Sequence, residues 1–263
     1  MEIKEYVRPA SLDEAYSLVV EKKGFPLGGG AWVHMNVRSV DLVVDLSALK
    51  LDYIVDKGDT VEIGAMATAR QIETSALLNQ AFSGAFARAT EHLVGVQLRN
   101  LITIGGTIAG KYGFSDLVTL LSALDAKLVL YRDKTIDIAS FLTAARETPY
   151  LIEKIIVAKN SVVAFQSVRV TQNDFAILNA GAAFHAGKGW QIAVGARPAA
   201  ARLAGKAAKY VGMNRKPDEH TAQEAGRLAS EEISFGSDVR GSDEYRKLAC
   251  ETLVMRAIME AAK

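Results

Sequence analysis

The stretch from Asn100 to Ala126 constrains this chain more than any other part of its sequence. It reads NLITIGGTIAGKYGFSDLVTLLSALDA, an apolar run and a Gly-Gly pair, then a loop ending at Ser115-Asp116 and a segment with the pattern of a helix. Glycines lack a Cβ, so their backbone N–H groups can approach an anionic ligand. The carboxylate that follows can accept hydrogen bonds from hydroxyl groups. These features together indicate a nucleotide site.

A second glycine run, Gly28-Gly29-Gly30, follows a short predicted strand at 25–27. We call residues 27–32 the first glycine loop and residues 103–107 the second glycine loop. Each follows an apolar segment and precedes a segment that can be helical, so the two loops could hold a diphosphate between them. Neither fits the phosphate-binding pattern G-x-x-x-x-G-K-[ST] or the dinucleotide pattern G-x-G-x-x-G. Spacing alone therefore leaves open that both are simply tight turns.

Composition excludes several classes of function. The chain has 263 residues and a net charge of +1, with 31 basic and 30 acidic side chains, so no strong field favours nucleic acid or an anionic membrane. No apolar run approaches the roughly 20 residues needed to span a bilayer, and the N-terminus is charged rather than signal-like. We expect a soluble, cytoplasmic protein.

The chain has a single cysteine, Cys250, so it can form neither an internal disulfide nor a cysteine-ligated iron–sulfur cluster. Cys250 shares a helix face with Leu253 and Val254, which places the thiol in a core. The histidines are not at metal-ligand spacings, and no metal site is predicted. They are His34, His92, His185 and His220.

Strand and helix patterns divide the chain into three units, residues 1–50, 51–158 and 159–263. The first is a small α/β unit with a helix capped by Ser11 and a possible helix over 31–37. The second is α+β, with strand hairpins and helices near 69–77, 81–89 and 117–124. The third has three antiparallel strands, followed by helices near 221–233 and 243–259. The fold class predicted is α+β rather than a doubly wound Rossmann fold.

Short motifs that cover most of the chain resemble one family, the FAD-binding medium subunits of molybdenum hydroxylases, which include xanthine dehydrogenase and carbon monoxide dehydrogenase. The most specific is RNLITIGGTIA, which resembles the family's RNxATIGGNIA. In chain order the similar segments are IGAMAT (63–68), RNLITIGGTIA (99–109), SDL (115–117), LLSALDAKL (120–128), NDFAILNAGAAF (173–184), IAVGARPAAAR (192–202) and GSDVRGSDEYRKLACETLVMRAI (236–258).

The resemblance implies a two-subdomain FAD-binding unit of the PCMH or vanillyl-alcohol-oxidase type, then a C-terminal domain with a three-stranded antiparallel sheet. It implies that the two glycine loops bind the diphosphate, that Asp116 accepts from a sugar or ribityl hydroxyl, and that Leu93 and Ile152 are apolar neighbours of a ring. No residue is expected to be catalytic. The expected FAD-binding residues are Leu27, Gly28, Gly29, Gly30, Ala31, Trp32, Leu93, Thr103, Gly105, Gly106, Thr107, Asp116 and Ile152.

As a function, the resemblance implies electron transfer. A molybdopterin large subunit would oxidise the substrate, an iron–sulfur small subunit would relay the electrons, and FAD on this chain would pass them to NAD+ or another acceptor. The sequence departs from the family pattern at LGGGAWVHM in place of AGGTDLL, at Thr107 in place of asparagine, and at Gln166 in place of a lysine. We therefore expect residues 103–116 to hold FAD more tightly than the first glycine loop.

Two other classes of function stay open at this point. One is a self-sufficient flavoenzyme of the vanillyl-alcohol-oxidase type, which often links its flavin to a histidine such as His34 or His92. The other is a cofactor-free scaffold subunit. Tyr112 and Phe114 either cover the flavin edge or are exposed loop aromatics, the second being favoured, and Trp32 is expected to pack between subdomains.

Overall fold

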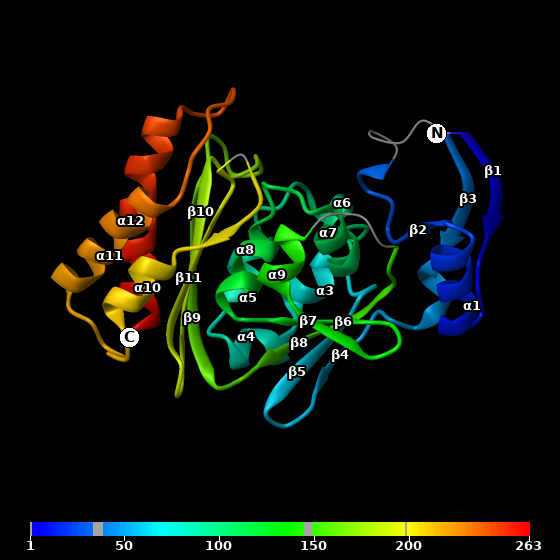
Figure 1. Ribbon diagram of the computed structural model, residues 1–263, viewed down its shortest axis with the longest axis horizontal. Coiled ribbons are helices and arrows are strands. Elements are labelled where there is room, and N and C mark those ends of the chain that lie inside the picture. Colours follow the sequence, from blue (N-terminus) through cyan, green and yellow to red (C-terminus); the bar gives the residue numbers. More distant parts are fainter. Residues whose placement is uncertain (1, 34–38, 145–148, 198) are drawn as a thin grey trace.

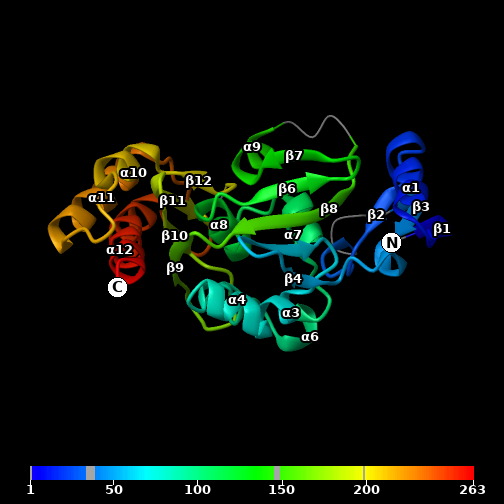
Figure 2. The same ribbon diagram turned by 90° about the horizontal axis from the view of Figure 1, so that it is seen from below.

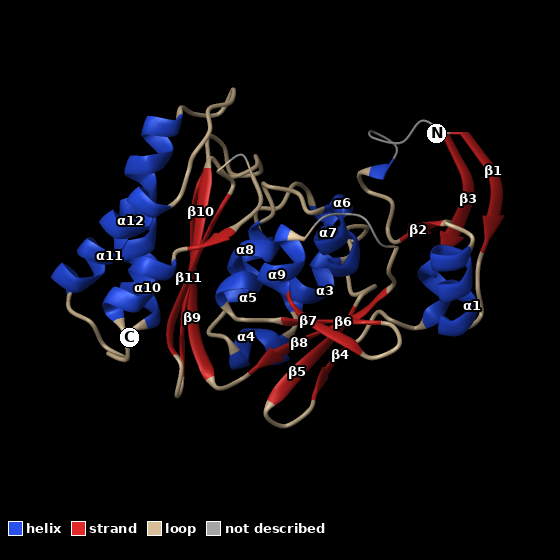
Figure 3. Cartoon of the chain, in the orientation of Figure 1, coloured by secondary structure: helices blue, strands red, loops and turns tan. Residues whose placement is uncertain are grey.

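The computed structural model describes residues 2–33, 39–144, 149–197 and 199–263. Three sheets follow one another along the long axis, with the N-terminal unit at one end and the C-terminal helices at the other (Figure 1). Figure 3 shows that helices fill the space between the middle sheet and the C-terminal sheet. The helix predicted over 31–37 lies largely outside the described residues.

The N-terminal unit is a three-stranded parallel sheet in the order β1-β3-β2. Its helix begins after Ser11, whose hydroxyl accepts the backbone N–H of Glu14, as the capping pattern predicted. The sheet and helix bury an apolar core that includes Ala15 and Val44. The elements are β1 (Glu2–Val7), α1 (Leu12–Tyr16), the π-helical turn Ser17–Glu21, β2 (Phe25–Leu27), β3 (Ser39–Asp45) and the 3₁₀ turn Leu46–Leu49.

The middle unit is a five-stranded antiparallel sheet in the order β4-β5-β8-β6-β7. Its strands are β4 (Ile54–Asp56), β5 (Thr60–Gly64), β6 (Lys127–Leu130), β7 (Lys134–Asp137) and β8 (Ile152–Ala158). Its helices are α3 (Ala69–Thr74), α4 (Ala76–Ala81), α5 (Ala85–Thr90), α6 (Val96–Arg99), α7 (Ile104–Gly110), α8 (Asp116–Ala123) and α9 (Ile138–Thr143).

Helix bounds in this unit were predicted wrongly at two points. The helix predicted near 69–77 is interrupted at Ser75, where α3 ends at Thr74 and α4 begins at Ala76. The sequence pattern suggested a helix over 81–89, but α4 ends at Ala81 and α5 begins at Ala85. Between them Ser83 and Gly84 have φ angles of 51° and 74°, which are left-handed and interrupt a helix.

The C-terminal sheet is antiparallel, with the order β12-β11-β10-β9. Its strands are β9 (Ser161–Val168), β10 (Leu178–His185), β11 (Gly189–Gly195) and β12 (Arg202–Leu203), and the helices that follow are α10 (Gly205–Val211), α11 (Glu219–Glu232) and α12 (Asp243–Ala261). The α+β class is confirmed. The sequence predicted three strands in this sheet, and the structure has a fourth, β12. It was missed because a two-residue strand is too brief to leave a sequence pattern.

Helices cover both faces of this C-terminal sheet. Helices α10, α11 and α12 lie on the outer face and α8 of the middle unit packs against β10 and β11 on the inner face (Figure 2). Cys250 is fully buried in the outer core, as predicted, and burial raises the pKa of its thiol to about 12. In the part of the chain that the structure describes, no helix is long and apolar enough to cross a membrane.

Candidate functional site

The two glycine loops, more than 70 residues apart in sequence, lie against each other. A Cβ placed on Gly29 would come within 1.4 Å of the Leu101 carbonyl oxygen, and one on Gly28 within 2.6 Å of Thr103 Oγ1. Only a residue without a side chain allows so close an approach of two backbones. The structure thus brings together the two segments that the sequence singled out, and glycine makes the contact possible.

The second glycine loop is the start of a helix, not the Gly-Gly turn that the sequence suggested. Thr103 is the N-cap of α7, and Gly105 and Gly106 lie in its first turn. A Cβ on Gly105 would be 2.7 Å from the Ala65 carbonyl oxygen, so this glycine is needed for packing between α7 and the segment after β5.

Every backbone N–H in this first turn already has an acceptor. The four N–H···O distances are 2.9 Å from Ile104 to the Ala67 carbonyl, 2.8 Å from Gly105 to the Ala65 carbonyl, 3.2 Å from Gly106 to Thr103 Oγ1 and 2.9 Å from Thr107 to the Thr103 carbonyl. Thr103 and Thr107 are buried, whereas Gly106 is exposed. The prediction that this loop contacts a diphosphate stays a prediction, but its N–H groups from Ile104 to Thr107 already donate within the chain.

The first glycine loop differs from the second in the hydrogen bonding of its backbone N–H groups. Within the described part of the chain, the N–H groups of Gly29, Gly30 and Ala31 donate no hydrogen bond. All three residues are partly accessible to solvent. Gly30 has a φ of 73°, a left-handed conformation that turns successive N–H groups toward one side of the chain. These are the properties of an anion-binding loop.

Leu93 packs beside the first glycine loop, whereas Ile152 lies in a different part of the core. Leu93 is 8% exposed and belongs to a small apolar cluster with Ala69 and Ile102, against which Ala31 and Trp32 pack. Ile152 lies on β8 within the main core of the middle unit, opposite Leu130. Of the two apolar residues predicted to flank a ring, the structure places Leu93 beside the first glycine loop and Ile152 in a separate cluster.

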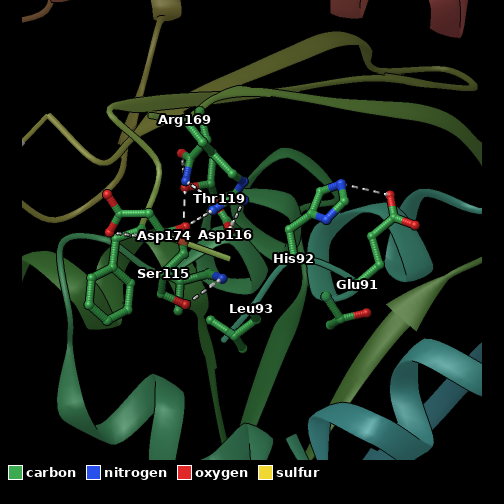
Figure 4. A network of polar contacts seen from close by, with 12 residues as sticks. Glu91, His92, Leu93, Ser115, Asp116, Thr119, Arg169 and Asp174 are labelled. Atoms are coloured by element: carbon green, nitrogen blue, oxygen red, sulfur yellow. Dashed lines mark hydrogen bonds and ion pairs between the residues drawn. The ribbon is translucent and has the colours of Figure 1, made fainter. Parts of the chain in front are cut away.

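Asp116, predicted to accept from a ligand hydroxyl, is 1% exposed and has protein partners on both carboxylate oxygens (Figure 4). Arg169 donates from its guanidinium to Oδ2, and Asn179 donates from Nδ2 to Oδ1 at 2.5 Å. Thr119 in turn donates to Asn179 Oδ1 at 2.8 Å. Burial raises the pKa of the Asp116 carboxyl, and the Arg169 guanidinium opposes that shift. The network joins α8 to the C-terminal sheet.

Sequence reasoning did not identify Arg169 or Asn179. Asn179 lies within the family-like segment NDFAILNAGAAF, so that motif was a usable signal. Arg169 follows β9 and lies outside the motifs, and it also donates to the Asp174 carbonyl at 2.7 Å. Its pairing with Asp116 depends on the packing of two domains, which no local pattern reveals.

Aromatic side chains from all three units meet beside the first glycine loop. The ring centroids of Trp32 lie 6.1 Å from Phe114 and 5.7 Å from Phe175, and those of Phe114 and Phe175 are 4.1 Å apart. Tyr112 stacks on Phe114 at 5.2 Å. The prediction that Trp32 packs between subdomains is confirmed. The favoured interpretation of Tyr112 and Phe114 as exposed loop aromatics is wrong, because both are partly buried in this cluster.

A cavity of about 380 Å³ lies between the end of α5 and the end of β9, with His92 and Arg169 in its lining. Glu260 of α12 lies nearby and accepts from Arg88 at 2.5 Å and from Gln166. Gln166, which replaces a family lysine, therefore contributes a neutral donor to an ion pair that links α5 and α12.

Comparison with known proteins places this chain in one family. Residues 1–159 match the family described as the FAD-binding domain in molybdopterin dehydrogenase, and residues 163–261 match the CO dehydrogenase flavoprotein C-terminal domain. The chain belongs to the FAD-binding flavoprotein subunits of the molybdenum hydroxylases. FAD is accordingly its cofactor, and it is a subunit of an FAD-dependent oxidoreductase.

Individual relatives support this family assignment. The chain is 32% identical to the nicotinate dehydrogenase FAD-subunit of Eubacterium barkeri over 48% of this chain and 45% of that subunit. It is 26% identical to the glyceraldehyde dehydrogenase medium chain of Sulfolobus acidocaldarius, with 98% of each chain covered.

Two solved structures show the same fold from end to end. Quinoline 2-oxidoreductase from Pseudomonas putida 86 superposes with a TM-score of 0.87 at 21% identity, over 100% of this chain and 97% of the other. CO dehydrogenase from Oligotropha carboxidovorans gives 0.87 at 23% identity, over 100% and 98%. At these identities the likeness establishes the fold and leaves the chemistry to the family and the site.

Proposed function

We propose that this chain is the electron-transfer subunit of a multi-subunit molybdenum hydroxylase. It would take electrons from an iron–sulfur partner subunit and deliver them to NAD+ or another acceptor, while a molybdopterin partner oxidises the substrate. The names of the relatives, an FAD-subunit and a medium chain, support a division of labour among subunits. The single cysteine is buried and protonated at neutral pH, so clusters on this chain are not supported.

The observation that carries the cofactor assignment is the first glycine loop, where the N–H groups of Gly29, Gly30 and Ala31 have no acceptor among the residues that the structure describes. Backbone donors of this kind suit the oxygens of a diphosphate. Leu93 would supply an apolar surface beside them. When bound, the flavin supplies the redox chemistry, and the protein binds it, orients it and limits access of water.

A flavin titration of the purified chain tests this proposal. Binding of FAD, followed by its visible absorbance and by quenching of its fluorescence, should saturate at one flavin per chain. The chain should then copurify with a cysteine-rich subunit and a large molybdopterin subunit, and by itself it should hydroxylate nothing. Failure to bind FAD would overturn the proposal, as would robust substrate oxidation by the single chain.

A further inference from the structure

Arg99 is the arginine that opens the RNLITIGG segment, and its guanidinium is buried, with a side chain only 7% exposed. Nε donates to Glu73 Oε2 at 2.8 Å and one terminal nitrogen donates to Glu73 Oε1 at 3.3 Å, a two-point contact with one carboxylate. The other terminal nitrogen donates to the backbone carbonyls of Leu93 and Val94 at 3.3 and 2.9 Å. One planar group thus ties α3 to the segment between α5 and α6.

The segment held in this way is strained. Val94 has a φ of 45°, which a β-branched residue rarely adopts and which persists only where surrounding contacts impose it. The two carbonyl contacts from Arg99 are such contacts. The strained backbone sets the direction of Leu93, which packs with Ala31 and Trp32 of the first glycine loop.

Arg99 also influences that loop from a second side. It is the last residue of α6, and two residues later comes Leu101, whose carbonyl oxygen lies against the backbone of Gly29. A displacement of Arg99 would therefore move both surfaces on which the loop rests, the Leu93 side chain and the Leu101 carbonyl.

We propose that Arg99, oriented by Glu73, is a positioning residue for the first glycine loop and so for the flavin diphosphate. The inference rests on the proposed cofactor role of that loop. Arginine is required because its fork reaches the carboxylate and both carbonyls at once, whereas a lysine is a single point of charge. Glu73 matters because it fixes the plane of the fork.

The test uses Arg99→Lys, Glu73→Gln and the exchanged pair Glu73→Arg/Arg99→Glu, with Arg70→Lys as the matched control. Arg70 contacts the same Glu73 carboxylate at 3.0 Å but is 41% exposed, so its replacement should change little. Loss of charge-assisted hydrogen bonds predicts roughly tenfold weaker FAD binding for Arg99→Lys and Glu73→Gln. The exchanged pair restores the ion pair but not the donors to Leu93 and Val94, so stability should recover in part while FAD affinity does not.

A second readout needs no flavin. In a Trp190→Phe background Trp32 is the only tryptophan, and its emission should shift in Arg99→Lys and stay unchanged in Arg70→Lys. If the parent chain binds FAD and Arg99→Lys leaves both affinity and Trp32 emission unaltered, the positioning role is refuted. If the parent chain binds no FAD, the proposed function fails instead, and the Trp32 shift still decides whether Arg99 positions the loop.

Discussion

In the second glycine loop every backbone N–H from Ile104 to Thr107 donates within the chain, whereas in the first glycine loop those of Gly29, Gly30 and Ala31 donate to none of the described residues. The same residue type serves two purposes. Gly105 makes room for packing on Ala65, and the glycines of the first loop leave N–H donors without an acceptor among the described residues. A glycine motif can therefore be conspicuous in a sequence because it supports the packing of a neighbouring loop.

Asp116→Ala should have the largest effect on stability. Asp116 is the first residue of α8, which follows the second glycine loop. It leaves the Arg169 guanidinium buried without its carboxylate, so we expect a loss of about 3–5 kcal/mol in the free energy of unfolding, measured with urea. The exposed Asp59→Ala is the control and should stay within about 0.5 kcal/mol. Unchanged stability with weakened FAD binding would instead assign Asp116 to the ligand.

Gly29→Ala and Gly105→Ala form a matched pair, because each adds a methyl group against a backbone carbonyl. Overpacking of this kind costs about 1–3 kcal/mol. For Gly29→Ala we expect the cost mainly in FAD affinity, roughly 5- to 100-fold. For Gly105→Ala we expect it mainly in unfolding free energy, because α7 must move away from Ala65. The reverse pattern would show that the second loop is the ligand loop.

Gly30→Ala should have the smallest effect. The added Cβ meets only Leu27 Cδ1, at 3.6 Å, so there is space for it, and the cost is the left-handed backbone, about 1 kcal/mol. FAD affinity in a fluorescence titration should fall by less than for Gly29→Ala. A larger fall for Gly30→Ala would mean that the loop's φ angle, rather than its contact with Leu101, controls binding.

Much of the fold was predictable from the sequence because its signals are local. The Ser11 cap, the hairpin turn at Gly58 and the buried face containing Cys250 each depend on residues a few positions apart. The helix at Ile104–Gly110 was not predicted, because two adjacent glycines disfavour a helix and its start is stabilised by distant carbonyls.

The sequence could predict which segments form the candidate site, but not which side chains from different segments contact one another. The sequence indicated both glycine loops and Leu93, but the ion pair between Asp116 and Arg169 joins residues 53 positions apart in different domains. Phe175 reaches Trp32 through the same domain packing. Such pairs form only when the three units assemble, so periodicity and short motifs carry no trace of them.

Hydrogen–deuterium exchange of the purified chain, with and without FAD, tests the difference between the two loops most directly. We expect the backbone amides of Gly29, Gly30 and Ala31 to exchange readily without FAD and to gain protection when it is added, because these N–H groups, which donate to none of the described residues, acquire phosphate acceptors. Peptides covering 104–109 should already be protected and change little. Protection gained at 104–109 with none at 28–33 would contradict the assignment of the first glycine loop as the diphosphate site.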